Sequence, residues 1–449
     1  MISNDFEYNY STSSVINNTQ NDKSFLLSHC TEIEEDSKIP CFFYGNILNA
    51  FIASKCLSTL AKTVRSHFSL TPGQLSALRD PIVSVGNQQL HFEAFSSCNS
   101  VYARVDILPQ GIDGDFLASG CTNVDFNDHT VRAFNTINRN EKLILGIGQK
   151  DIHIVTEKTT SVEKKVSLPN RWIKGLSNVQ LYLSQMEFMF LINQIQAIQL
   201  FQGLPKTPVK NDYYIIQQSG KLQFSPIAKG NHIRIGGVHR LRLFENLLPF
   251  VKEISFYKDL DEQSVALILH FQDTQMLFTF SASVFRGFSG EGKNLENMTT
   301  VIPDEWIIGI NNLCKTNEIF DSTLLAIEND INLNTMDNLQ ASLSSIGLLG
   351  YDLESQKHFY RRLPFKLQRL KSLNPRWQNA QKLLYKNEVS IVKNENQNIE
   401  AQVKGTAEVT HRVLINKGEA RCTCTWFTNH QTNRGLCKHI LAVKMKLEL

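Results

Sequence analysis

The sequence has few features of a membrane or secreted protein. Its longest uncharged stretch, residues 188–205, contains five asparagine and glutamine residues, so we interpret it as a buried helix and not as a membrane span. Six of the nine cysteines are isolated from one another, and the N-terminus does not read as a secretory leader. These absences favour a reducing, cytoplasmic location.

Catalytic motifs are also missing. Gly146 and Gly148 are separated by one residue, as are the first two glycines of a dinucleotide-binding loop. The third glycine of such a loop is absent, and a strand-like segment follows. After Gly287, the turn that would carry a hydrolase serine has Glu291 in place of its second glycine. The sequence therefore predicts a protein that is not an enzyme, and an unrecognised activity in its large body is the least favoured alternative.

The formal net charge of +3 conceals a division along the chain. From Ser355 to the C-terminus there are 18 basic and 6 acidic residues, a net charge of +12, whereas the preceding part carries −9. A basic C-terminal part attached to a mildly acidic body indicates that an acidic protein or a polyanion binds the C-terminal third.

The most basic segment, residues 355–387, has nine basic residues, no carboxylate and five interleaved aromatic residues. Basic side chains neutralise phosphates and aromatic rings stack on bases, so the segment is a candidate surface for nucleic acid or another partner. The alternative, which the sequence leaves open, is a solvated basic face that packs its aromatic residues against the acidic body. The candidate binding residues here and further along the chain are Arg361, Arg362, Lys366, Arg369, Arg376, Trp377, Arg421, Arg434 and Lys438.

Hydrophobic periodicity predicts a mixed, α+β chain. We expect helices at 47–64, 178–202 and 338–349, and antiparallel strands within 82–155 and 213–285. The fold class is a large body of antiparallel strands and buried helices, followed by a small zinc-stabilised ββα module.

Shifts in composition divide the chain into four parts. They are a polar, mobile tail (1–38), the body (39–354, with a subdomain boundary expected near residue 205), the basic segment (355–387) and the C-terminal module (388–449). Alternating aromatic residues at Phe6, Tyr8 and Tyr10 leave an edge strand as the alternative for part of the tail.

The C-terminal module contains the most specific pattern in the sequence. Cys422 and Cys424 are separated by one residue, twelve residues follow, and Cys437 and His439 are again separated by one. Three sulfur ligands and one imidazole in two close pairs are the donor set of a tetrahedral Zn2+ site. Because four protein ligands fill the coordination sphere, we expect one structural zinc ion. The competing interpretation is three buried thiols with an unrelated histidine.

Periodicity predicts how the two pairs reach the metal. Residues two apart on an extended segment point to the same side, so Cys422 and Cys424 can face one ion from a strand or hairpin end. The side chains of two residues that are two positions apart on a helix point away from each other. We therefore place Cys437 just before a helix and His439 in its first turn. Arg421, Arg434 and Lys438 lie near enough in sequence to offset the negative charge of the site. His430, between the pairs, is the less favoured alternative ligand.

The spacing C-x-C-x12-C-x-H, together with the CKHILAV segment, closely resembles the SWIM zinc finger. The resemblance implies that a short β-hairpin carries the first pair, that the second pair opens a helix, and that the module binds DNA or protein. Val413 and Ile415 fall in an extended run before the pattern, and a turn at 416–418 fits the implied hairpin.

Shorter segments from Pro40 onward are similar to one bacterial group of SWIM proteins. They are CTNVDFN, LPNRWIKGL, RGFSGEG, RRLPF and RGLCKH. That group is associated with MoxR-type AAA+ ATPases and von Willebrand factor A domain proteins, which implies a non-catalytic adaptor that binds protein partners. A nucleic-acid-binding protein that uses the basic segment and the finger is the alternative function.

Overall fold

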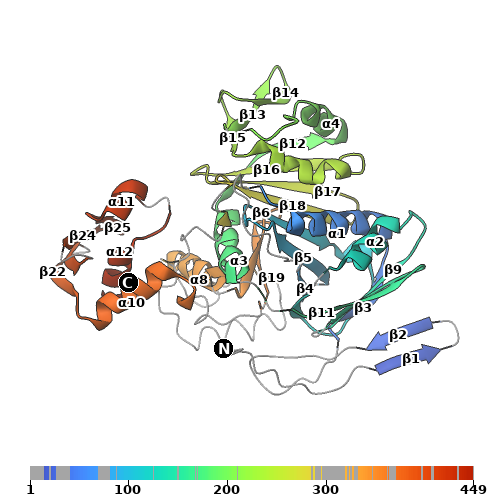
Figure 1. Ribbon diagram of the computed structural model, residues 1–449, viewed down its shortest axis with the longest axis horizontal. Coiled ribbons are helices and arrows are strands. Elements are labelled where there is room, and N and C mark those ends of the chain that lie inside the picture. The colour runs from blue at the N-terminus through green and yellow to red at the C-terminus, as the bar shows by residue number, and fades with distance from the viewer. Residues whose placement is uncertain are drawn as a thin grey trace. The chain divides into compact units, whose positions relative to one another are not determined.

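The computed structural model divides the chain into two compact units (Figure 1). Unit 1 comprises 1–169, 185–287 and 361–364, and unit 2 comprises 170–184, 288–360 and 365–449. The residues that the structure describes are 15–19, 22–26, 41–68, 81–86, 88–124, 126–148, 151–166, 168, 170–209, 211–284, 287–288, 295, 319–320, 323, 326–327, 332–345, 347–361, 363, 371–395, 398–405, 409–431 and 434–447.

Unit 1 is built around an eight-stranded sheet in the order β12-β16-β17-β18-β6-β5-β4-β8, with every neighbouring pair antiparallel. This agrees with the expected antiparallel strands. The strands are β4 (Ile82–Gly86), β5 (Gln89–Phe95), β6 (Val101–Ile107), β8 (Gly120–Asn123), β12 (Met186–Asn193), β16 (Glu253–Asp259), β17 (Ser264–His270) and β18 (Thr274–Ser281).

One face of this sheet is apolar and is covered by α1 (Ala50–Arg65), which contacts β5, β6 and β18 (Figure 1). Asn49 caps the helix, because its side-chain oxygen accepts a hydrogen bond from the backbone N–H of Ile52 at 3.3 Å. Leu57, Leu60 and Val64 are buried, as the helical spacing of apolar residues predicted. The helix contributes to the hydrophobic core of unit 1.

The opposite face carries ionisable side chains that are nevertheless buried. On β5 and β6, the Asp106 carboxylate accepts hydrogen bonds from His91 Nδ1 at 2.6 Å and from Arg104 Nε at 2.9 Å. Burial by itself would raise the pKa of Asp106, but the Arg104 guanidinium and His91 hold that pKa below its usual value. The carboxylate is therefore kept charged within the sheet.

A second buried cluster corrects one expectation. Arg361, predicted as a surface binding residue, is 3% exposed, and its Nη1 donates to both carboxylate oxygens of Glu93 on β5. The Tyr102 hydroxyl donates to the same carboxylate. The sequence could not predict this pairing, because Arg361 and Glu93 are 268 residues apart.

Two smaller sheets and two helices complete the main part of unit 1. A five-stranded sheet has the order β11-β10-β9-β3-β7, and a three-stranded sheet has the order β14-β13-β15. Their bounds are β3 (Phe43–Ile47), β7 (Ile112–Phe116), β9 (Leu143–Ile147), β10 (Asp151–Thr156), β11 (Thr160–Lys164), β13 (Tyr213–Gln218), β14 (Lys221–Ser225) and β15 (His232–Ile235). The helices are α2 (Asp128–Thr136) and α4 (Gln194–Gln202), with 3-10 turns η1 (Pro109–Gly111) and η2 (Val238–Leu247).

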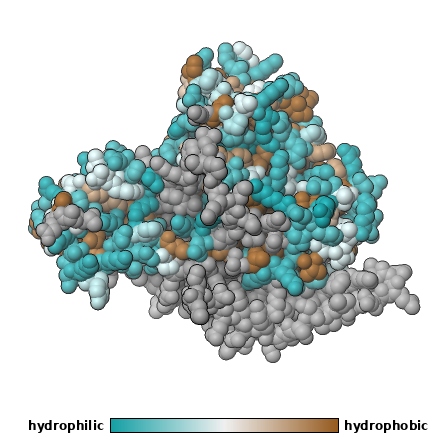
Figure 2. Space-filling view, in the orientation of Figure 1, coloured by the Kyte–Doolittle hydropathy of each residue, from teal (hydrophilic) through white to brown (hydrophobic). Residues whose placement is uncertain are grey.

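The prediction of one long buried helix at 178–202 is wrong. The structure has α3 (Asn170–Leu183), then strand β12, then α4, which Asn193 opens with a capping box. Alternating aromatic and aliphatic residues in β12 pair with β16 instead of forming a helix. Phe188 is 53% exposed and Leu191 is 51% exposed, and Figure 2 shows hydrophobic atoms at the surface in the region of α4. Absence of charge in this stretch therefore did not mean burial.

The N-terminal part predicted as a polar tail contains a hairpin of β1 (Val15–Thr19) and β2 (Asp22–Leu26). Residues Phe6, Tyr8 and Tyr10 lie outside the described residues. None of the described helices is long and apolar enough to cross a membrane.

Unit 2 contains α3 packed against α8 (Leu333–Ser345) and a three-stranded sheet in the order β19-β21-β20. The expected helix at 338–349 is thus placed about one turn earlier. The strands are β19 (Ile319–Phe320), β20 (Leu349–Asp352) and β21 (Lys357–Tyr360). Of residues 285–294, which include the RGFSGEG segment, only 287 and 288 are among the described residues.

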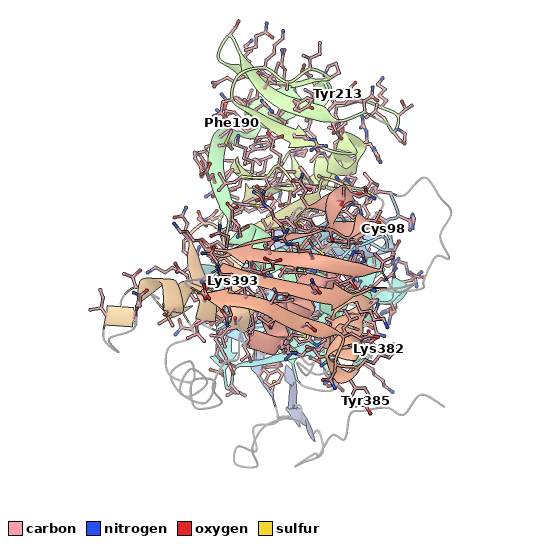
Figure 3. All side chains as sticks on the ribbon, turned by 90° about the vertical axis from the view of Figure 1, so that its left-hand side faces the viewer. Cys98, Phe190, Tyr213, Lys382, Tyr385 and Lys393 are labelled. Atoms are coloured by element: carbon pink, nitrogen blue, oxygen red, sulfur yellow. The ribbon has the colours of Figure 1, made fainter. Side chains whose placement is uncertain are left out.

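The remaining described elements of unit 2 are helix α10 (Pro375–Tyr385) and the C-terminal module, which ends with α12 (Lys438–Leu447). Its four-stranded antiparallel sheet has the order β22-β23-β24-β25 and faces the viewer in Figure 3, where Lys393 marks β22 and Tyr385 the end of α10. The elements are β22 (Val389–Glu395), β23 (Asn398–Lys404), β24 (Thr410–Asn416), β25 (Glu419–Cys422) and α11 (Thr425–His430).

The buried Arg361–Glu93 pair leads to a prediction on stability. In Arg361→Met, the Glu93 carboxylate stays buried without its cation, which should lower the free energy of unfolding by about 3–5 kcal/mol. Adding Glu93→Gln should recover part of the loss, because the uncompensated charge is then removed. Arg412→Met is the matched control, since Arg412 pairs with Glu400 at the surface. Its loss should leave the midpoint urea concentration of unfolding unchanged. Urea unfolding followed by far-ultraviolet circular dichroism measures all four proteins.

Candidate metal centre

The sheet of the C-terminal module holds the first pair of candidate ligands. A two-residue turn at Lys417 and Gly418, both with positive φ (46° and 90°), connects β24 to β25, and glycine adopts such angles without strain. Cys422 is the last residue of β25, and Cys424 is the N-cap of α11, with its Sγ accepting from the Phe427 N–H at 3.4 Å. The extended backbone between them turns both sulfurs to the same side.

The second pair lies at the start of α12. Cys437 directly precedes the helix, and its carbonyl accepts the Leu441 N–H at 3.0 Å. His439 is in the first helical turn, so the predicted placement of both residues is confirmed. The next four residues of the helix, Ile440, Leu441, Ala442 and Val443, are buried.

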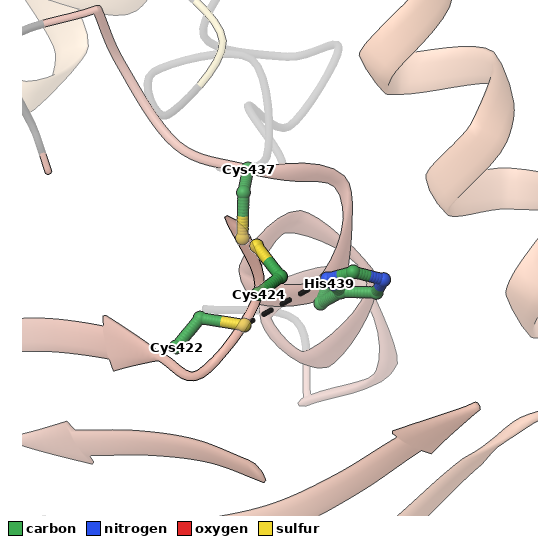
Figure 4. Close-up of side chains that lie close together, drawn as sticks. All are labelled: Cys422, Cys424, Cys437 and His439. Atoms are coloured by element: carbon green, nitrogen blue, oxygen red, sulfur yellow. Dashed lines mark hydrogen bonds between the residues drawn. The ribbon is translucent and has the colours of Figure 1, made fainter. Parts of the chain in front are cut away.

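Figure 4 shows the four side chains converging. Their ligand atoms all lie within 4.8 Å of one another, and all four residues are buried. The Sγ of Cys422 is 3.7 Å from Nδ1 of His439. In a tetrahedron with Zn–S of about 2.3 Å and Zn–N of about 2.0–2.1 Å, a sulfur and a nitrogen are separated by about 3.6 Å. The cluster therefore fits one structural zinc ion, with Nδ1 as the histidine ligand.

The proximity of three sulfurs also changes their acidity. Cys424 accepts hydrogen bonds from Cys422 and Cys437, and these lower the pKa of Cys424. The hydrogen bonds of the Cys422 thiol with Cys424 and Cys437 raise the pKa of Cys422. Three thiols brought this close cannot all ionise without a cation between them. A divalent metal supplies that cation, which is why metal binding and folding are coupled at such sites.

Sequence comparison agrees with this geometry. Residues 411–448 match the SWIM zinc finger family. The match covers the SWIM finger alone, from strand β24 to the end of α12. No curated protein matches the chain.

Two solved structures resemble a larger part of the chain. Proliferating cellular nuclear antigen from Entamoeba histolytica matches with 10% identity and a TM-score of 0.35, covering 54% of this chain and 98% of that chain. The PCNA2–PCNA3 complex from Sulfolobus tokodaii matches with 8% identity and a TM-score of 0.38, covering 54% and 99%. Both scores are too low to define the fold of this chain.

Arg376 on α10 supports the loop that leads to Cys437. Its Nη1 donates to the carbonyl oxygens of Arg434 at 2.7 Å and Leu436 at 3.1 Å. Its guanidinium also lies over the Trp426 ring, 4.7 Å from the centroid. Arg376, predicted as a binding residue, therefore positions the backbone beside a zinc ligand.

The other predicted binding residues lie in different environments. Trp377 is 4% exposed, so it is not available for stacking with a base. Arg421 is exposed on β25, with its side chain 77% accessible, and Lys438 and Arg434 are partly exposed. Arg362, Lys366 and Arg369 lie outside the described residues. The predicted basic segment is thus divided between the two units, with Arg361 in unit 1 and residues from 365 onward in unit 2.

Two residues of the centre were not found from the sequence. The His411 ring contacts that of His439, with centroids 4.4 Å apart and the ring planes tilted by 40°, and Trp426 contacts both Arg376 and His430. His430, the alternative ligand, is partly exposed and lies near Arg434 instead of the cluster. No spacing signal joins His411 to His439 or Trp426 to Arg376, because these partners come from separate elements.

Zinc content is the first measurement for this centre. We expect one zinc per chain in the purified protein and loss of the metal in Cys437→Ala, accompanied by unfolding of the module, because structural zinc contributes about 10 kcal/mol or more to such folds. Cys98→Ser in unit 1 is the matched control and should keep its zinc. Elemental analysis and circular dichroism report the two effects; a metal-free wild-type protein with a folded module would contradict the assignment.

The support from Arg376 can be tested separately. Arg376→Met should keep the four ligands but weaken zinc binding by about 10–100-fold, since groups behind metal ligands orient them. Lys382→Met on the same helix, with an exposed side chain, is the control and should bind zinc like the wild type. Competition with a chromophoric chelator measures the affinities, and equal affinities in all three proteins would refute the role.

Proposed function

We propose that this protein is a non-catalytic adaptor whose zinc-stabilised C-terminal module binds protein partners. The observation that carries the proposal is the closed donor set of three cysteines and one histidine, all buried. With four protein ligands on a tetrahedral ion, no coordination position is left for water or substrate. Such a centre stabilises a surface and does not perform metal-assisted chemistry.

The exposed face of the module supports protein binding. On β22–β25, one set of side chains packs inward, while the other set is exposed and mixes charged, amide and apolar groups. Val392 is 56% exposed and Leu414 is 37% exposed among these polar neighbours. Apolar groups surrounded by polar ones are typical of protein interfaces, whereas a uniformly cationic face would favour nucleic acid.

The partner class comes from the sequence resemblance. A bacterial group with similar segments is associated with MoxR-type AAA+ ATPases and von Willebrand factor A domain proteins, so these are the partners that we propose. Binding to an ATPase of this kind would make the zinc module a recognition element in a maturation or chaperone system.

Nucleic-acid binding is the second candidate function. Tyr385 at the end of α10 is 91% exposed, and Lys382 lies near it (Figure 3). Lys386, the next residue in the sequence, is also exposed. An exposed ring among cations can stack on a base. Two of the residues predicted for this function, Arg361 and Trp377, are buried and are therefore not available to bind nucleic acid.

Affinity purification from the source cells tests the adaptor function. The wild type and Cys98→Ser should recover the same ATPase or von Willebrand factor A domain protein, and Cys437→Ala should lose it, because its module no longer folds. Recovery of nucleic acid in place of protein would favour the second candidate. A partner retained equally by Cys437→Ala would show that the module is not the binding element.

A further inference from the structure

A hollow lies beside the outer strand of the zinc module. Its volume is about 760 Å3, and it opens to solvent along β25. The residues that line it are Gly418, Glu419, Ala420, Arg421, Cys422, Phe427, Thr428, Gln431 and Leu436. The hollow thus combines the whole backbone of one strand with one face of α11 and the loop that leads to Cys437.

Strand β25 is at the edge of its sheet, paired within the described part of the chain with β24 alone. In an antiparallel pair, alternate residues direct both N–H and C=O toward the partner strand. Arg412 and Thr423 form one such pair, because the Thr423 N–H donates to the Arg412 carbonyl at 3.1 Å. By alternation, Arg421 also faces β24, and Ala420 and Cys422, which line the hollow, direct their N–H and C=O groups away from β24.

Side chains of the strand alternate in the perpendicular direction. Ala420 and Cys422 point to the buried face of the sheet, and Glu419 and Arg421 point to the exposed face. A further strand paired with β25 would follow the same alternation. Its inward side chains would enter the hollow beside Phe427 and Leu436, and its outward side chains would lie next to Arg421.

Charge favours an acidic occupant. The Arg421 side chain is 77% exposed, and it lies 3.8 Å from the Glu419 carboxylate, which is too long for a hydrogen bond. Lys417 is exposed in the adjacent turn. A carboxylate opposite Arg421 on a neighbouring strand would form a favourable cross-strand pair.

We propose that the hollow binds an extended peptide of a partner protein, added as a fifth strand to β25, in which apolar residues alternate with acidic ones. This proposal rests on the adaptor function and specifies its partner. Outward N–H and C=O groups at the spacing of a strand are complementary to a peptide backbone, whereas a nucleic acid has no such repeat. Because Cys422 is both a zinc ligand and part of the hollow, the binding edge depends on the metal.

Selection of random displayed peptides on the zinc-loaded full-length protein tests the proposal. We expect a consensus of alternating apolar and acidic residues. The labelled consensus peptide is then titrated by fluorescence anisotropy against wild type, Arg421→Glu, Ala420→Pro and Lys404→Glu. Proline at Ala420 removes an outward N–H and leaves the ladder to β24 intact, as edge strands permit.

Arg421→Glu and Ala420→Pro should each weaken binding by about tenfold or more, since each removes a charge pair or a backbone donor. Lys404→Glu changes the net charge equally but lies on strand β23, which β24 separates from β25, so it should bind like the wild type. Zinc content of each variant confirms that the module is folded. N-methylation of the peptide amides that face β25 should abolish binding. N-methylation of the other, alternate set of amides should leave binding unchanged.

Three results would overturn the proposal: no consensus, equal binding by all four proteins, or equal weakening by Arg421→Glu and Lys404→Glu together with displacement by single-stranded DNA. The last result would indicate general electrostatic binding of nucleic acid. If strand addition is wrong but the adaptor function is right, Cys437→Ala should lose its protein partner. Arg421→Glu and Ala420→Pro should then retain that partner. Failure of the adaptor function would leave no partner that depends on zinc.

Discussion

Coordination of one zinc ion by four side chains is the constraint on which the C-terminal module depends. Cys422 and Cys424 leave the edge of a sheet, and Cys437 and His439 begin a helix, so the metal fixes that helix against that sheet. Mutual proximity of three thiols is unfavourable unless a cation neutralises them. Arg376 then fixes the intervening loop from a second helix, through carbonyl groups next to the ligand Cys437.

Unit 1 uses charge in a different way. Its eight-stranded sheet has one apolar face under α1 and one face on which Glu93, Arg361, Asp106 and Arg104 are buried. Buried charges are tolerated there because each carboxylate has a guanidinium and a further donor, Tyr102 or His91. Such pairs contribute little net stability compared with apolar packing but penalise any arrangement that separates them. Arg361 belongs to unit 1 as part of the short segment 361–364, whereas residues 288–360 and 365–449 belong to unit 2.

The proposed function is placed on the exposed surface of the zinc module and not on either kind of centre. The zinc site is closed and the ionic clusters of unit 1 are buried, so neither is arranged to bind a substrate. What remains accessible in the module is its exposed sheet face and the free edge of β25, where backbone groups and Arg421 face solvent. In the proposal, metal binding and partner binding are coupled because Cys422 belongs to both the metal centre and the lining of the hollow.

The sequence alone determined the four zinc ligands, the strand-then-helix placement of the two pairs, the antiparallel character of the body and helix α1, because each follows from local spacing and periodicity. It predicted one long helix where the structure has α3, β12 and α4, since an uncharged apolar run does not distinguish a helix from a strand that pairs with distant β16. Only the tertiary structure decided that Arg361 and Trp377 are buried, that Arg376 supports the metal loop, and that β25 is an edge. Those properties depend on contacts between residues far apart in the chain, and spacing along a single sequence carries no information about them.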